Sequence, residues 1–104
     1  MTLVEINETN FENEVLQSTV PVAVDFYGDY CGPCRMIKPA LTLLAEELAG
    51  QAKIVAVDVA KNRQLVTHYG ISSVPTILVI RNRNEVHRMV GLGALVELRD
   101  VLES

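Results

Sequence analysis

The alternation of apolar and polar positions along the chain predicts five short strands and four helices. Nearly continuous apolar runs are typical of strands that are covered on both faces. The expected strands are Leu3–Ile6, Val22–Tyr27, Lys53–Val59, Thr76–Ile80 and Glu85–Val90. Apolar residues spaced three or four apart predict helices at Phe11–Leu16, from Pro33 or Cys34 to about Ala49, at Asn62–Tyr69 and at about Ala94–Leu102.

The longest predicted helix carries one apolar stripe and one internal proline. The stripe follows the spacing i, i+4, i+7 and i+11 and consists of Ile37, Leu41, Leu44 and Leu48. Pro39 removes a hydrogen bond from the helix interior, which predicts a kink, and Gly50 is expected to end the helix. The last helix has a similar stripe at Leu95, Leu98 and Leu102.

The order of these elements predicts an α/β fold. A strand, a helix and another strand in succession imply a parallel, right-handed crossover. The last two strands are joined by a short turn, Arg81–Asn84, in which an asparagine is suited to a positive φ angle, so they form a hairpin. We therefore expect a central mixed β-sheet with helices on both faces, in a single domain of residues 1–104. In open sheets of this kind, ligands bind beyond the carboxyl ends of the strands.

Composition narrows the class of protein further. Apolar residues make up 49% of the chain, enough for a core that needs no disulfide staples. The net charge of -4 argues against nucleic-acid binding, and no apolar run approaches the roughly 20 residues of a membrane span. Residues 1–5 lack the basic and apolar regions of a signal peptide, so we expect a soluble, cytoplasmic protein. In that compartment thiols stay reduced, and a reactive pair of thiols is more often catalytic than structural.

The only two cysteines, Cys31 and Cys34, lie three residues apart where a strand meets a helix. A thiolate at the start of a helix faces free backbone N–H groups and the positive end of the helix dipole, which lower the pKa of the thiol and make it a better nucleophile. The second thiol, one helical turn further on, is placed to attack a mixed disulfide that the first has formed. This arrangement predicts thiol–disulfide exchange.

Two other uses of a cysteine pair fit the sequence less well. A zinc site needs four ligands, and the only histidines, His68 and His87, are 19 residues apart instead of forming a closely spaced second pair. A purely structural disulfide between residues 31 and 34 would close a very short loop, for which the gain in stability is smallest. We therefore expect no metal, and no cofactor besides a redox-active disulfide.

Asp25 interrupts the apolar run of the second strand, so we expect its carboxyl group to be buried, and burial raises the pKa of a carboxyl group. Two roles are open to it. It is either an acid at a strand end that reaches solvent or caps a loop, or a buried base that takes the proton of Cys34, directly or through a water. We favour the base, because the six residues from Asp25 to Cys31 allow the acid to lie beneath the start of the helix.

Several motifs in combination resemble the thioredoxin family along the whole chain. They are Asp25-Phe26-Tyr27-Gly28-Asp29-Tyr30-Cys31-Gly32-Pro33-Cys34-Arg35, Pro39, Tyr69-Gly70-Ile71, Val74-Pro75-Thr76 and Gly91. From local sequence alone the Val74-Pro75 bond would be trans, as most X–Pro bonds are. The resemblance implies a cis bond there, and a central sheet flanked by four helices.

The resemblance also implies roles for individual residues. Cys31 would attack the target disulfide, Cys34 would resolve the mixed disulfide, and Asp25 would accept the proton. We expect Cys31 to lie exposed at the start of the helix, and Cys34 to be shielded behind it and to point toward Asp25. Gly32 and Pro33, between the cysteines, would tune the redox potential. The implied substrate groove, in which an extended target chain pairs with the Val74 backbone, is lined by Tyr30, Ser73, Val74, Pro75 and Gly91. The implied partners are disulfide-containing target proteins and a thioredoxin reductase, and we expect a monomer that binds neither nucleic acid nor membranes.

The chain departs from the usual family pattern in four places. Tyr27 and Tyr30 stand where the family usually has tryptophan, and the chain contains no tryptophan. Ala56 stands where the family often has a lysine close to the buried acid. The usual Asn-Gly turn between the last two strands is replaced by Arg81-Asn82-Arg83-Asn84. These changes bear on proton transfer, target range and the choice of reductase, and they leave the thiol chemistry in place.

Two alternative functions remain beside a protein-disulfide reductase. A disulfide isomerase or oxidase domain is disfavoured by Gly32-Pro33, where a histidine would be expected, and by the missing signal peptide. A binding subunit would use the groove at Cys31 and Pro75 for docking, with incidental redox activity, since a fold does not fix a function. The variant Cys31→Ser separates these classes, because docking would survive it and disulfide reduction would not.

Overall fold

The structure is a computed structural model that describes residues 3–104. Met1 and Thr2, which belong to the segment inspected for a signal peptide, lie outside the described residues. The sheet has five strands in the order β1-β3-β2-β4-β5. They are β1 (Val4–Glu5), β2 (Val22–Tyr27), β3 (Lys53–Asp58), β4 (Thr76–Arg81) and β5 (Asn84–Val90). β1, β3 and β2 are parallel, while β4 runs antiparallel to β2, and β5 antiparallel to β4. The mixed sheet expected from the sequence is confirmed.

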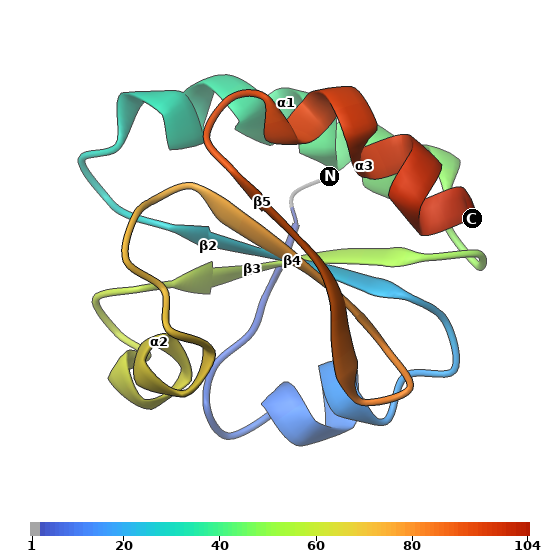
Figure 1. The fold of residues 1–104 in the computed structure, drawn as a ribbon, viewed down its shortest axis with the longest axis horizontal. Coiled ribbons are helices and arrows are strands. Elements are labelled where there is room, and N and C mark those ends of the chain that lie inside the picture. Colours follow the sequence, from blue (N-terminus) through green and yellow to red (C-terminus); the bar gives the residue numbers. More distant parts are fainter. Residues whose placement is uncertain (1–2) are drawn as a thin grey trace.

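Helices cover both faces of the sheet, as Figure 1 shows. One face carries α1 (Gly32–Glu47) and α3 (Ala94–Glu103), and the opposite face carries the short π-helix η1 (Glu12–Leu16) and α2 (Arg63–Tyr69). β2 lies in the middle of the sheet and contributes side chains to the core on both of its faces, because successive side chains of a strand point to opposite faces. Ala23 packs beneath α1 and α3, whereas Val24 and Phe26 pack toward η1 and α2. This double coverage explains why β2 is apolar at nearly every position.

The apolar stripe predicted for the long helix is what anchors α1 to the sheet. All four of its members are buried, namely Ile37, Leu41, Leu44 and Leu48. They join a cluster with side chains of β2, β3, β4 and α3. In α3, Leu98 and Leu102 are buried, and Leu95 packs at the edge of the same cluster. Pro39 lies inside α1 as expected.

Several predicted boundaries differ from the observed ones, each by one or two residues. β1 covers two residues instead of four, although Ile6 still donates a hydrogen bond to the Ala56 carbonyl oxygen at 2.8 Å. α1 ends at Glu47 instead of Ala49, and Gly50 follows with a φ of 87° in the turn beyond the helix. β3 ends at Asp58, one residue earlier than predicted. Each difference lies at an element end, where backbone hydrogen bonding changes gradually.

The turn between β4 and β5 has two residues with positive φ. Asn82 has a φ of 50°, as expected for an asparagine in this turn, but Arg83 also has a positive φ of 73°, which the sequence did not indicate. The Arg83 guanidinium forms two hydrogen bonds to the Glu12 carboxylate, at 2.7 and 3.0 Å. The turn is therefore tied to the N-terminal residue of η1.

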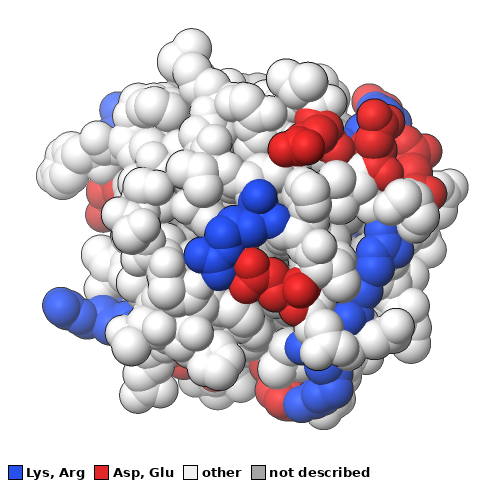
Figure 2. Space-filling model, in the orientation of Figure 1, with Lys and Arg blue, Asp and Glu red and all other residues white. Residues whose placement is uncertain are grey.

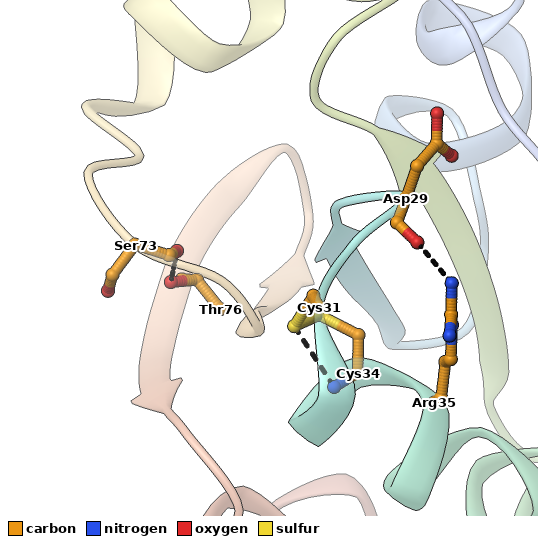
Figure 3. The surroundings of a disulfide bond; sticks show 6 residues. All are labelled: Asp29, Cys31, Cys34, Arg35, Ser73 and Thr76. Atoms are coloured by element: carbon orange, nitrogen blue, oxygen red, sulfur yellow. Dashed lines mark hydrogen bonds between the residues drawn. A yellow bond between two sulfur atoms is a disulfide. The ribbon is translucent and has the colours of Figure 1, made fainter.

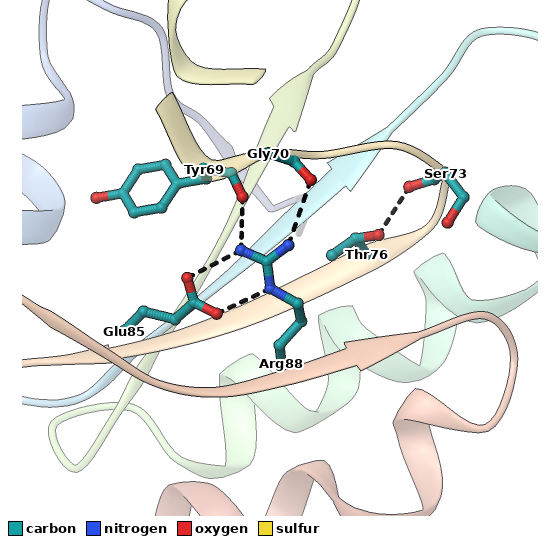
Figure 4. A network of polar contacts seen from close by, with 6 residues as sticks. All are labelled: Tyr69, Gly70, Ser73, Thr76, Glu85 and Arg88. Atoms are coloured by element: carbon teal, nitrogen blue, oxygen red, sulfur yellow. Dashed lines mark hydrogen bonds and ion pairs between the residues drawn. The ribbon is translucent and has the colours of Figure 1, made fainter. Parts of the chain in front are cut away.

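A second arginine fixes the end of α2. The Arg88 guanidinium, on β5, donates to the backbone carbonyl oxygens of Tyr69 and Gly70 and pairs with Glu85 at 2.8 and 2.9 Å (Figure 4). Gly70 adopts a left-handed conformation with a φ of 62°, which ends α2 as the sequence predicted. The chain then continues into residues 71–75, so Arg88 holds the start of the segment that leads to Pro75.

Charges of both signs are mixed on the face drawn in Figure 2, with no continuous basic surface there. This view agrees with the overall charge of -4. Within residues 3–104, no helix has the length and apolar character needed to cross a lipid bilayer.

We predict that α1 depends on its buried stripe for most of its packing energy. Leu41 is fully buried, so Leu41→Ala should lower the free energy of unfolding by about 2 to 5 kcal/mol in urea denaturation. Leu43 lies on the same helix with 60% of its surface exposed, so Leu43→Ala is the matched control and should change stability by about 0.5 kcal/mol or less. Equal losses for the two variants would contradict the packing described here.

Candidate functional site

The two cysteines lie at the junction that the sequence predicted, between the carboxyl end of β2 and the first turn of α1. They form a disulfide, with their Cα atoms 5.2 Å apart (Figure 3). Cys31 is the N-cap of α1, and its Sγ accepts a hydrogen bond from the Cys34 backbone N–H at 3.1 Å. Pro33 occupies the first turn, where a missing N–H costs no helical hydrogen bond. Once the disulfide is reduced, the same N–H groups and the helix dipole would stabilise a thiolate on Cys31.

The expectation that Cys31 is exposed is wrong for this oxidised form. Only 9% of Cys31 is exposed, compared with 4% of Cys34. The disulfide draws the Cys31 sulfur against the first turn of α1, and the loop before β4 faces it (Figure 3). The neighbouring Tyr30 is the residue that projects outward, with 98% of its surface exposed.

The residues assigned to a substrate groove do come together beside the disulfide. β4 runs antiparallel to β2, so the loop that precedes it reaches the sheet edge at which β2 ends. The Val74-Pro75 bond is cis, which confirms that part of the resemblance. Gly91 donates its backbone N–H to the Pro75 carbonyl oxygen at 2.9 Å, and the Thr76 hydroxyl donates to the Ser73 carbonyl oxygen at 2.7 Å. These contacts hold the loop in place opposite Cys31.

Gly28 lies between the loop and the disulfide. A Cβ atom at Gly28 would lie 3.5 Å from Cγ2 of Val74 and 3.9 Å from Cβ of Cys31. Val74 and Cys31 therefore flank the same small residue. Val74 is half-buried and Ser73 is exposed.

Asp25 is buried on the sheet face beneath α1, with 3% of its surface exposed. It pairs laterally with Ala56 of β3 and Ile77 of β4, and neither side chain offers a hydrogen bond. Its Oδ1 is buried and has no hydrogen-bond partner within the described residues. Burial raises the pKa of Asp25 to about 7, although the Lys38 ammonium lowers that pKa and the Glu5 carboxylate raises it. The expectation that Asp25 is buried, with a pKa raised by that burial, is confirmed.

Asp25 and Cys34 border one cavity of about 150 Å³, large enough for water. Its lining is Leu3, Asp25, Tyr27, Gly28, Asp29, Cys34, Arg35, Lys38 and Ala56. The Arg35 guanidinium donates to the Asp29 carbonyl oxygen at 2.8 Å and so ties α1 to the loop before it (Figure 3). The structure thus brings the second thiol and the buried acid to one small space, as the base hypothesis requires.

Sequence reasoning missed two charged residues near Asp25. Lys38 follows Cys34 by four residues, one helical turn, and this spacing was an available signal. Glu5 shares a lateral row with Ala56 and Asp25 across three parallel strands, which only the strand register reveals. The Tyr27 hydroxyl, at a position where tryptophan was usual, donates to the Glu5 carboxylate at 2.9 Å.

The arrangement is suited to redox chemistry at sulfur. Within the part of the chain that the structure describes, no group of three or more His, Cys, Asp or Glu is placed to hold a metal ion. A thiol pair at a helix N-terminus, beside an acid whose pKa of about 7 allows it to take or give a proton near neutral pH, fits disulfide exchange with proton transfer.

Comparison with known proteins points in the same direction. The sequence matches the family described as Thioredoxin over residues 2–104. It is 37% identical to Thioredoxin 1 of Nostoc sp. over 99 residues, which cover 95% of this chain and 92% of the relative. It is 42% identical to Thioredoxin of Haemophilus influenzae over 89 residues, covering 86% of this chain and 83% of the relative. Thioredoxin 1 of Synechococcus elongatus is 35% identical over 98 residues, covering 94% and 92% respectively.

We predict that Asp25 makes the protein less stable as the pH rises. Its pKa is about 7 in the folded protein, against an ordinary value of 3.8, so the native state binds the proton more tightly than the unfolded chain does. The stabilising contribution of the protonated form is complete below the unfolded pKa and is lost as pH rises through the folded pKa. The free energy of unfolding of Asp25→Ala, relative to the parent, should therefore increase by roughly 2 to 3 kcal/mol from pH 5 to pH 8.

Denaturant melts of the oxidised proteins at several pH values measure this difference. Leu78→Ala, at a buried apolar position of β4 on the opposite face of the sheet, is the matched control, and its stability relative to the parent should be the same at each pH. A relative stability of Asp25→Ala that is constant or falls with pH would show that the carboxyl group is not destabilised by burial.

Proposed function

Because the chain belongs to the thioredoxin family and is a thiol–disulfide oxidoreductase, we propose that it reduces protein disulfides, with Cys31 as the attacking thiol, Cys34 as the resolving thiol and Asp25 as the proton acceptor. The observation that carries this assignment is the shared cavity of Asp25 and Cys34, with Cys31 on the other side of the disulfide as N-cap of α1. The proposal divides the reaction into two exchanges of a sulfur–sulfur bond.

In the first exchange, the reduced Cys31 thiolate attacks one sulfur of the target disulfide. A bond forms between Cys31 Sγ and that sulfur, the target disulfide breaks, and the other target sulfur leaves as a thiolate. The charge on Cys31 is stabilised by the N–H groups of the first turn of α1, of which the Cys34 N–H is already directed at Sγ. Gly32 and Pro33 set the geometry of that turn, and through it the redox potential of the pair.

In the second exchange, Cys34 loses its proton to the Asp25 carboxylate and attacks Cys31 Sγ. The mixed disulfide breaks, the intramolecular disulfide forms, and the second target sulfur leaves as a thiolate. The target has then gained two electrons and this chain has lost two. A base is most effective when its pKa is near the working pH, and the pKa of Asp25, about 7, meets that condition. The 150 Å³ cavity leaves room for a water to carry the proton.

The groove beside the disulfide is proposed to bind the target chain in an extended conformation. Tyr30 supplies an exposed ring, and Ser73, Val74, Pro75 and Gly91 supply a backbone edge on the other side of Cys31. Backbone pairing between the target chain and the groove gives affinity through main-chain hydrogen bonds and tolerates many target sequences. It suits a protein that serves many disulfide-containing targets.

The remaining parts of the proposal concern the setting of the reaction. Disulfide-containing substrates and a reductase partner follow from the family in general. We propose that a thioredoxin reductase returns two electrons to the Cys31–Cys34 disulfide, that the protein works as a monomer in the cytoplasm, and that it requires no metal and no other cofactor. Its net charge of -4 suits a protein that stays dissolved while it meets many partners.

We predict that the two cysteines fail in different ways when replaced. Cys34→Ser should accumulate a mixed disulfide with a disulfide-containing target such as insulin, because Cys31 still attacks and nothing resolves the product. Cys31→Ser is the matched control and should neither trap the target nor reduce it. Non-reducing electrophoresis and mass spectrometry detect the trapped species. Trapping by Cys31→Ser would reverse the assignment. A parent protein that binds the target without reducing it, together with equal binding by Cys31→Ser, would favour a docking function.

We predict that Asp25→Ala slows the resolving step. Without the proton acceptor, Cys34 must lose its proton to solvent, so resolution of a preformed mixed disulfide should be slowed roughly tenfold or more near neutral pH. The initial attack by Cys31 should change much less. Stopped-flow measurement of the two steps with a chromogenic disulfide separates them. A resolving step as fast as that of the parent would rule out Asp25 as the base.

A further inference from the structure

We propose that Lys38 is a positioning residue for the proton transfer between Cys34 and Asp25, and that Tyr27, anchored by Glu5, holds the Lys38 ammonium group at the mouth of their cavity. The inference rests on the proposed role of Asp25 as proton acceptor. In this proposal Lys38, on α1, supplies the positive charge near Asp25. β3 supplies none beside Asp25, because its residue there is Ala56.

The first support is geometric. Lys38 lines the same cavity as Asp25 and Cys34, although it lies on the exposed side of α1. It therefore bridges solvent and the buried acid. Cys34 and Lys38 are separated by one helical turn, so the resolving thiol and the ammonium group approach the cavity from the same helix.

The second support is the aromatic ring of Tyr27, which forms a platform beneath the Lys38 ammonium group. Its Nζ lies 5.9 Å from the centre of the Tyr27 ring, a distance at which a cation is attracted to an aromatic face. The Tyr27 hydroxyl donates to Glu5 Oε1 at 2.9 Å, which fixes the ring relative to β1. Tyr27 is two residues after Asp25 on β2 and so lies on the same face of the sheet. A ring held at one end by Glu5 thus positions a cation beside Asp25.

Lys38 is one of several titratable or charged groups near Asp25. The titratable or charged groups near Asp25 are Glu5 from β1, Tyr27 from β2, Asp29 from the following loop, and Cys34, Arg35 and Lys38 from α1. Asp58, at the end of β3, pairs laterally with Tyr27. β4 places the uncharged Ile77 beside Asp25, and α3 contributes Ala94, Leu98 and Leu102 to the cluster on this face. The Arg35 guanidinium is engaged with the Asp29 carbonyl oxygen.

Lys38 and Glu5 act on Asp25 with opposite signs. Burial is the largest influence and raises the pKa of Asp25, the Lys38 ammonium opposes it, and the Glu5 carboxylate reinforces it. The pair therefore sets where, in the range around neutrality, Asp25 changes from base to acid. Because Lys38 is exposed, its influence should weaken as ionic strength rises.

The test compares single charge removals of opposite sign. The side-chain carboxyl carbon of Asp25 is followed by ¹³C NMR through a pH titration of the oxidised protein. Lys38→Met should raise the titration midpoint by about 0.5 pH unit or more, and Glu5→Gln, whose amide oxygen can still accept from Tyr27, should lower it. Lys38→Arg keeps the charge and should retain most of the parent midpoint. Tyr27→Leu, which removes the platform, should shift the midpoint in the same direction as Lys38→Met.

Lys53→Met is the matched control, because it removes the same charge at the opposite end of β3, where Lys53 pairs laterally with Val22. It should leave the Asp25 midpoint unchanged. The kinetic arm measures the resolving step with preformed mixed disulfide across the same pH range. Its midpoint should move with the NMR midpoint, so that below it Lys38→Met is about threefold slower than the parent. The double variant Asp25→Ala with Lys38→Met should be no slower than Asp25→Ala alone.

The outcomes separate this inference from the proposed function. If Lys38→Met leaves the NMR midpoint where it is in the parent, the inference is wrong, whatever Asp25 does. If the midpoint moves and Asp25→Ala abolishes the pH dependence of resolution, but Lys38→Met leaves that dependence unchanged, Lys38 does not act in the reaction and the inference is again wrong. If Asp25→Ala itself resolves as fast as the parent, the proposed role of Asp25 is wrong and the inference falls with it.

Discussion

The site of this protein is organised around one physical constraint, which is a carboxyl group buried in the middle of the central strand. Every lateral neighbour of Asp25 within the sheet is apolar, and one of its oxygens has no hydrogen-bond partner within the described residues. An ionised carboxylate in such a place is costly, so the proton is held to much higher pH than in water. The small cavity under α1 and the cation at its mouth limit that cost without removing it. The site therefore keeps an acid that ionises near neutrality at the expense of stability, as active sites often do.

The junction between β2 and α1 places the two cysteines close to this buried carboxyl group. One strand supplies the acid and, a few residues later, one helix supplies both sulfurs, so their relative positions depend on a single short connection. The opposite wall is provided by the antiparallel β4, whose leading loop comes to the same sheet edge from a distant part of the sequence. Gly28 lies between the two walls, and Arg35 and Arg88 tie the flanking segments to backbone carbonyl oxygens. The reacting groups are thus held by regular elements, and the loops are short.

The sequence was informative where local chemistry decides the structure. Buried strands were recognised from their apolar runs, α1 from its stripe, and the thiol pair from its place between strand and helix. Asp25 was recognisable because it is the one charged residue in β2. Lys38 and Glu5 were not recognised, because their relation to Asp25 arises from helix packing and from the register of three strands. The burial of Cys31 in the oxidised protein was also missed, and the positive φ of Arg83 has no local signature in an arginine.

The shortness of β1 has a consequence for how the protein responds to warming. β1 contributes only Val4 and Glu5, is joined to the sheet through β3 alone, and lies at its edge. Short edge elements open locally at a lower free energy than the core and do so before the molecule unfolds. When β1 frays, the Glu5 carboxylate moves away from Tyr27, and the ring loses its anchor while the disulfide and the rest of the sheet stay folded. The proton-transfer site is therefore coupled to the shortest strand of the sheet, so heat would alter its acid–base behaviour at temperatures at which the fold itself still persists.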